Sequence, residues 1–142
     1  MSMTNGSFAA PISPDLTKEV QSFVVAIPAG AGAAQVVNPT VPVQAFTAYN
    51  YSNNLVRGTV TFSAGVTASG VAATRTFLVP PGASASIDFA DHAGDNAVGS
   101  VDGIDSVSFI AVDAGAATAE AGTLAATATA SAGLVYVNFS AA

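Results

Sequence analysis

The sequence predicts a single soluble all-β domain, an antiparallel β-sandwich of about eight strands, from three observations. First, its 142 residues include 18 Val and 8 Phe but only 5 Leu, 2 Glu and 1 Lys, so strand-forming residues dominate over helix formers. Second, several windows alternate apolar and polar residues with a period of two. Third, turn residues separate these windows at short intervals, with no helical crossover between them, which favours antiparallel sheets.

Residues 1–17 predict an extended N-terminal arm, and residues 18–142 the sandwich domain. The arm contains Gly6, Pro11 and Pro14 and shows no periodicity. It also lacks a basic leader and a continuous apolar run, so we expect no secretory signal peptide there.

The first half of the domain contains three expected strands. Residues 22–27 form a strand that is apolar on both faces, and residues 35–37 form a short edge segment. A third strand covers residues 43–51. Asparagine tolerates left-handed backbone conformations, so Ser-Asn-Asn at 52–54 predicts a hairpin turn into the next strand.

The middle of the chain shows the clearest alternation. Residues 57–63 place Val and Phe on one face and Thr and Ser on the other, and residues 84–89 repeat this pattern. A further strand covers residues 74–79. Pro-Pro-Gly at 80–82 predicts a type II turn, with proline at the second position and glycine supplying positive φ at the third.

The last part of the chain predicts three strands, at residues 106–112, 123–131 and 134–140. Residues 123–131 alternate Ala with Thr. Residues 114–122 are rich in Ala and predict a loop, with a short helix as the alternative. A jelly roll and an immunoglobulin-like sandwich both fit this order of strands.

Charged residues are unusually few, at 8% of the chain against about 25% in an ordinary soluble domain. The net charge of −6 makes nucleic acid a poor partner, and the absence of cysteine excludes disulfides and thiolate metal sites. No apolar run is long enough to span a membrane as a helix.

One acidic loop is the only candidate for chemistry. Oxygen-rich loops of this kind can bind Ca²⁺, but the spacing does not match an EF-hand, and a solvated loop is the preferred interpretation. A Ser–His–Asp triad would need His92 with Ser84 or Ser100, and no Gly-x-Ser-x-Gly elbow occurs. We therefore expect no enzyme, and no catalytic, cofactor-binding or metal-binding residue. The loop residues concerned are Asp88, Asp91, His92, Asp95, Asn96, Asp102 and Asp105.

Three Asn-x-Ser sequences match the N-glycosylation pattern, at Asn5, Asn50 and Asn138. Without an expected secretion signal, we interpret all three as coincidental.

Three expected strands are apolar on both faces, whereas a sandwich strand normally exposes one face to water. In the expected strand 106–112, Ile110 and Val112 lie on the face that should point outward. In the strand 134–140, Tyr136 lies on that outward face. The 37 residues from Val20 to Val56 carry no charge at all. Because large apolar patches mark interaction sites, we expect a symmetric homo-oligomer, with a trimer preferred, inside a larger assembly.

The proline-containing arm, the charge-poor Ser/Thr/Ala/Gly-rich sandwich and the turn at 77–84 resemble small structural proteins of tailed-phage virions. The resemblance is greatest to capsid decoration (cement) proteins. It implies a non-enzymatic virion subunit, assembled in the host cytoplasm, that clamps neighbouring capsomers by binding the major capsid protein or another virion subunit.

Two other roles remain open on the sequence. One is a bacterial surface-layer, pilus or adhesin subunit. The other is a carbohydrate-binding sandwich in which Tyr49, Tyr51 and Tyr136 stack on sugar rings.

Overall fold

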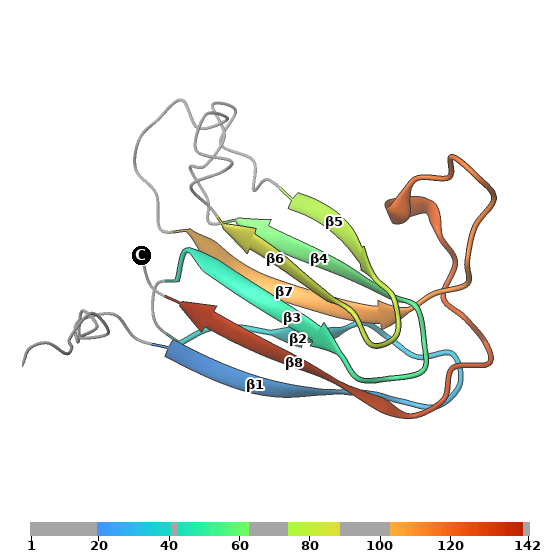
Figure 1. Ribbon diagram of the computed structural model, residues 1–142, viewed down its shortest axis with the longest axis horizontal. Coiled ribbons are helices and arrows are strands. Elements are labelled where there is room, and N and C mark those ends of the chain that lie inside the picture. Colours follow the sequence, from blue (N-terminus) through green and yellow to red (C-terminus); the bar gives the residue numbers. More distant parts are fainter. Residues whose placement is uncertain (1–19, 41–42, 63–73, 89–102, 141–142) are drawn as a thin grey trace, which may run out of the picture.

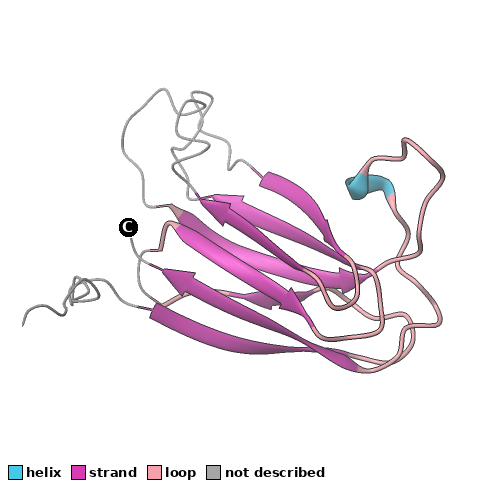
Figure 2. Cartoon of the chain, in the orientation of Figure 1, coloured by secondary structure: helices cyan, strands magenta, loops and turns pink. Residues whose placement is uncertain are grey.

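The computed structural model describes residues 20–40, 43–62, 74–88 and 103–140, and it confirms the antiparallel β-sandwich. The expected arm lies outside the described residues. In these described ranges eight strands follow one another, and a short 3₁₀ helix, η2, lies near the end of the chain (Figures 1 and 2). They are β1 (Val20–Ile27), β2 (Gln35–Val37), β3 (Ala45–Asn50), β4 (Val56–Phe62), β5 (Thr74–Val79), β6 (Ser84–Asp88), β7 (Ile104–Ala111), η2 (Ala121–Thr123) and β8 (Gly133–Ser140).

The strand pairing identifies the topology as a jelly roll. Strand β1 pairs with β8, β2 with β7, β3 with β6 and β4 with β5, all antiparallel, as in a long hairpin that has been rolled up. Additional β3–β8 and β4–β7 pairs join them into a first sheet, β1-β8-β3-β6, and a second sheet, β2-β7-β4-β5. This order is that of a jelly roll rather than of an immunoglobulin fold. Figure 1 looks onto the first sheet, with the second sheet behind it.

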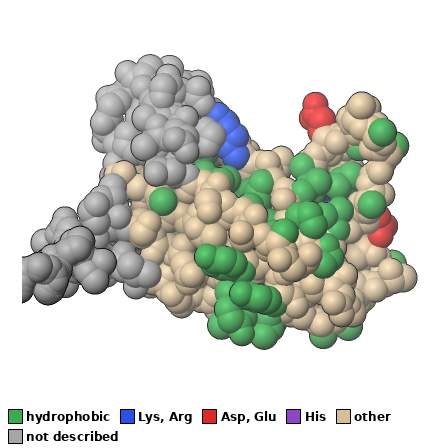
Figure 3. Space-filling view, in the orientation of Figure 1, with side chains coloured by type: hydrophobic (Ala, Val, Ile, Leu, Met, Phe, Trp, Pro, Cys, Tyr) green, Lys and Arg blue, Asp and Glu red, His purple; other side chains and the backbone are tan. Residues whose placement is uncertain are grey.

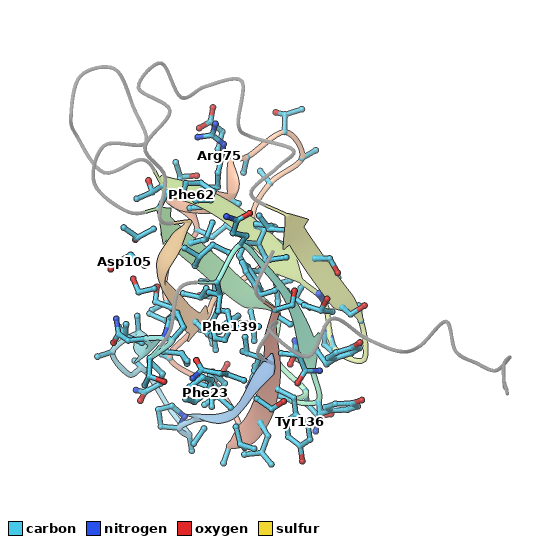
Figure 4. All side chains as sticks on the ribbon, turned by 90° about the vertical axis from the view of Figure 1, so that its left-hand side faces the viewer. Phe23, Phe62, Arg75, Asp105, Tyr136 and Phe139 are labelled. Atoms are coloured by element: carbon cyan, nitrogen blue, oxygen red, sulfur yellow. The ribbon has the colours of Figure 1, made fainter. Side chains whose placement is uncertain are left out.

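A chain of aromatic rings fills the space between the sheets. Phe139 of β8 lies at its centre, 5.8 Å from the ring of Phe23 and 6.0 Å from that of Phe46. Phe46 in turn contacts Phe77 across the core, and Phe77 contacts Phe109. Seen from the side, Phe23 and Phe139 point between the sheets, whereas Tyr136 points outward from the first sheet (Figure 4).

Gly58 in β4 makes room for one of these rings. It lies opposite Phe77, and a Cβ atom at this position would be 2.1 Å from the Phe77 ring. We expect Gly58→Ala to lower the free energy of unfolding by about 1–3 kcal/mol, because the ring must move within a filled core. Urea denaturation measures this loss. Gly122→Ala is the control, because its added Cβ would have only ordinary van der Waals contacts. An unchanged midpoint for Gly58→Ala would show that the ring has room to move.

Two local predictions were wrong, and one turn was confirmed. The segment 52–54 is not a hairpin, because β3 and β4 lie in different sheets and none of its residues has positive φ. Residues 123–131 form no strand, since the apolar side chains of their Ala/Thr alternation are single methyl groups that bury little area. The Pro80–Ala83 turn forms as predicted, with a hydrogen bond from Ala83 N to Pro80 O and a φ of 76° at Gly82. The expected loop at 114–122 also forms, and its last two residues begin η2.

Candidate interaction face

The sites considered for metal binding and hydrolysis fall mostly on residues 89–102, outside the described residues. Asp105 is described and lies exposed at the start of β7, and Ser84 is exposed on β6. Within the described parts of the chain, no three His, Cys, Asp or Glu side chains lie close enough together to bind a metal ion. The acidic loop therefore stays a sequence-based hypothesis.

The described charged side chains all belong to the second sheet or to the loop that follows it. Figure 3 looks onto the first sheet: hydrophobic and neutral atoms cover the front, and red and blue atoms appear only at its margins. None of the described side chains of β1, β8, β3 and β6 is charged; Asp88, the last residue of β6, pairs with Ala45 of β3, and its side chain is not among those described. The described charged residues are Arg57, Arg75, Asp105, Asp113 and Glu120.

One half of the outer face of the first sheet is polar. The strand register aligns Ser22, Asn138, Thr47 and Ser86 in a row across all four strands. The Ser22 hydroxyl donates to Asn138 Oδ1 at 2.8 Å, and the Thr47 and Ser86 hydroxyls lie 2.9 Å apart. These two contacts join neighbouring strands pairwise, so this half of the face is a polar surface with hydrogen bonds between its own side chains.

The other half is apolar and aromatic. The next outward row aligns Val24, Tyr136 and Tyr49, and Leu134 lies further along β8. Val24 is 63% exposed, which is unusual for a valine in the middle of an eight-residue strand. Together these side chains form an uncharged patch that extends across three neighbouring strands.

All three tyrosines of the chain meet in this patch, and we call them the tyrosine cluster. Tyr49 and Tyr51 stack at 6.4 Å between ring centroids, and Tyr136 meets Tyr51 edge-to-face at 5.1 Å. Tyr51 is 64% exposed and Tyr136 is 41% exposed. Tyr49 and Tyr51 share a face because they are two residues apart, and the β3–β8 register brings Tyr136 beside them. The cluster is therefore an exposed aromatic surface supported by a rigid sheet.

The outer surface of the second sheet differs, because the chain's own loop covers part of it. The expectation that Val112 needs a partner subunit was wrong: it is buried, and it forms a β-bridge with Ala126. Ile110 is half-buried beside Arg57. The Arg57 guanidinium holds this loop by donating to the carbonyl oxygens of Ala121, Gly122 and Leu124.

A buried polar network holds the crossing from β3 to β4, and sequence reasoning missed it. Asn50 is 1% exposed, and its Nδ2 donates to the carbonyl oxygens of Asn54 and Val79, both at 2.8 Å. Its Oδ1 accepts from the backbone N–H and the hydroxyl of Ser52. Because Asn50 is buried and both its amide hydrogens are used, it is no glycosylation site in the folded chain, whereas Asn138 is exposed.

The part of the chain that the structure describes contains no helix long and apolar enough to cross a membrane. Neither a protein-family model, nor a curated protein, nor a solved structure matches the chain. The physical character of the outer face of the first sheet is therefore the main guide to function.

Proposed function

We propose that this protein is a non-enzymatic structural subunit of a virus particle, of the capsid-decoration type. In this role it binds neighbouring capsid subunits, and further copies of itself, through the outer face of the first sheet. The jelly roll is compatible with this role, since viral capsid domains use it, but lectins and cupins use it as well. A fold that serves several functions cannot decide between them, so the proposal depends on the surface.

The observation that carries the proposal is the uncharged patch of the first sheet with its exposed tyrosine cluster. The centres of protein–protein interfaces are depleted of charged side chains and enriched in aromatic ones. Tyrosine is also one of the residue types that most often dominate binding energy, because it buries a large rigid area. The face around Val24, Leu134 and Tyr136 has this composition, whereas the described charges lie elsewhere.

Co-sedimentation with capsids tests the proposal. The full chain is mixed with particles assembled from the major capsid protein encoded in the same genome, and the bound copies are counted by quantitative mass spectrometry. We expect saturable binding at a fixed ratio to the capsid protein. Tyr136→Glu is expected to weaken binding at least about 100-fold, because it places a charge in the desolvated centre of the interface.

Thr74→Glu is the matched control, because it adds the same charge at an exposed position of β5 in the second sheet. It is expected to bind like the wild-type chain, and thermal unfolding checks that both variants are folded. Equal loss of binding in both variants would indicate a nonspecific charge effect. No binding by the wild-type chain would contradict the proposal.

The tyrosine cluster also supports a second candidate, a carbohydrate-binding module. Exposed, rigid aromatic rings offer flat apolar surfaces on which the C–H faces of sugar rings can pack. Ser84 pairs with Tyr49 across β3 and β6, and Asn53 follows Tyr51 by two residues; both are exposed and offer polar contacts beside the rings. Glycan-array binding that is lost in Tyr51→Ala would favour this candidate, and capsid binding without glycan binding would favour the first.

A further inference from the structure

The two sheets have four edge strands, and three of them carry features that prevent pairing with another chain. Soluble β-proteins protect their edges with charges, with proline or with very short strands. Strand β5 contains Arg75 and β6 ends at Asp88, while β2 has only three residues and is followed by Pro39. Strand β1 differs, since its eight residues include neither a charge nor a proline.

The free backbone groups of β1 can be assigned from the hydrogen-bond pattern. Tyr51 N donates to Leu134 O at 3.0 Å, so the N–H and C=O groups of Leu134 point toward β3. In an antiparallel sheet successive residues point to opposite sides, so Val135 points toward β1, where it pairs with Val25. The N–H and C=O groups of Val25 therefore point back to β8. The N–H and C=O groups that face away from the sheet belong to the alternate residues Ser22, Val24 and Ala26.

An open groove borders this edge, where β1 and β2 end the two sheets on the same side. The groove has a volume of about 270 Å³ and is lined by residues 23–26 of β1 and residues 35–38 at β2. None of these residues is charged, and Val24 and Val36 are both more than half exposed. Gln21, two residues before this lining segment of β1, forms two hydrogen bonds with Thr40, two residues after the lining segment at β2. Among the described residues, the outward backbone groups of β1 have no strand partner, and they lie beside uncovered apolar side chains.

We infer that β1 pairs antiparallel with β1 of a second copy of this chain, around a two-fold axis near Val24. Antiparallel pairing of a strand with itself is self-complementary under two-fold symmetry. It would place Ser22 of each copy opposite Ala26 of the other, forming about six main-chain hydrogen bonds. It joins the two first sheets into one eight-stranded sheet, in which the two uncharged patches around Val24 become continuous.

A second copy suits this edge better than a charged partner strand does. The strand has no charge that would be repelled by its symmetry mate, and the two Val24 side chains would cover each other on the outer face. This contact is two-fold, whereas a trimer needs a contact between two different surfaces. The inference does not depend on the virion proposal, because it concerns only the edge of β1.

Ala26→Pro is the test variant. Proline removes the backbone N–H of residue 26, which faces the open edge, so the pairing of β1 with β8 should persist. Ala26→Val is the matched control, because it keeps the N–H at the same position. We expect sedimentation velocity at micromolar concentration to give twice the chain mass of 13.8 kDa for the wild type and for Ala26→Val, but the single-chain mass for Ala26→Pro.

Hydrogen exchange provides a readout that does not depend on mass. The amides of Val24 and Ala26 should exchange slowly in the dimer and at least about tenfold faster when dilution separates the copies, while the amide of Val25 stays protected in both states. A wild-type monomer, a trimer, or a dimer that survives Ala26→Pro would overturn the inference. So would a dimer in which Val24 and Ala26 exchange freely. None of these outcomes changes the expected loss of capsid binding in Tyr136→Glu, which tests the proposed function separately.

Discussion

Asn50→Asp is expected to destabilise the protein by about 3–5 kcal/mol at neutral pH. The Asn50 amide group donates two hydrogen bonds to backbone carbonyls and accepts two from Ser52, in a place with almost no access to water. Aspartate keeps the shape but removes both donors, so a carboxylate oxygen would face the carbonyl oxygens of Asn54 and Val79. A buried charge facing two acceptors is among the most costly single changes in a core.

Asn53→Asp is the matched control, because it makes the same chemical change three residues away on an exposed side chain. It should change the free energy of unfolding by less than about 0.5 kcal/mol. Chemical denaturation of both variants, monitored by tyrosine fluorescence and by circular dichroism, measures the difference. Similar midpoints for the two variants would show that the Asn50 network does not hold the crossing between the sheets.

Phe139→Ala has the second large expected effect, a loss of about 3–5 kcal/mol. Phe139 is fully buried at the centre of the aromatic chain, in contact with Phe23 on one side and Phe46 on the other. Truncation removes its contacts with both rings and leaves a cavity that the paired strands cannot close by moving. The cost therefore includes both the lost transfer free energy and the cavity.

Phe23→Ala serves as the comparison, because Phe23 is only half-buried at the open edge of the same aromatic chain. Its truncation should cost about 1–2 kcal/mol in dilute solution, because less apolar area is lost and water can reach the space. Thermal and urea unfolding measure both values. A Phe139→Ala loss no larger than that of Phe23→Ala would contradict the central place of Phe139 in the core.

The sequence predicted all eight strands of the described residues to within two residues at each end, because alternation and turn residues are local signals; only the expected strand at 123–131 does not form. The type II turn at Pro80–Ala83 is likewise decided by three adjacent residues. The crossing at 52–54 could not be predicted in this way, because an Asn-rich turn looks the same whether it joins two strands of one sheet or of two sheets. Whether the segment joins strands of one sheet or of two depends on the hydrogen-bond partners of Asn50 and Asn54. These partners are the carbonyl oxygens of Val79 and Ser131, and both residues are distant in sequence.

The candidate face was predictable only in part. The low charge predicts an uncovered surface, and the sequence offers the three tyrosines as a stacking site. Their grouping depends on the register between β3 and β8, which no local pattern shows. The wrong expectation for Val112 has the same origin, since the loop that covers it follows it in sequence but carries no apolar periodicity.

The central claim is that other protein covers the outer face of the first sheet, and tyrosine nitration tests it most directly. The chain has three tyrosines and no tryptophan, and all three tyrosines lie on this face, so a tyrosine-specific reagent reports on it alone. The rate of nitration by tetranitromethane is compared between the purified, dilute chain and the same chain mixed with particles of the proposed capsid partner. We predict that Tyr51 and Tyr136 react readily in the purified chain and become strongly protected in the particle. Equal reaction rates in the two states would contradict the account.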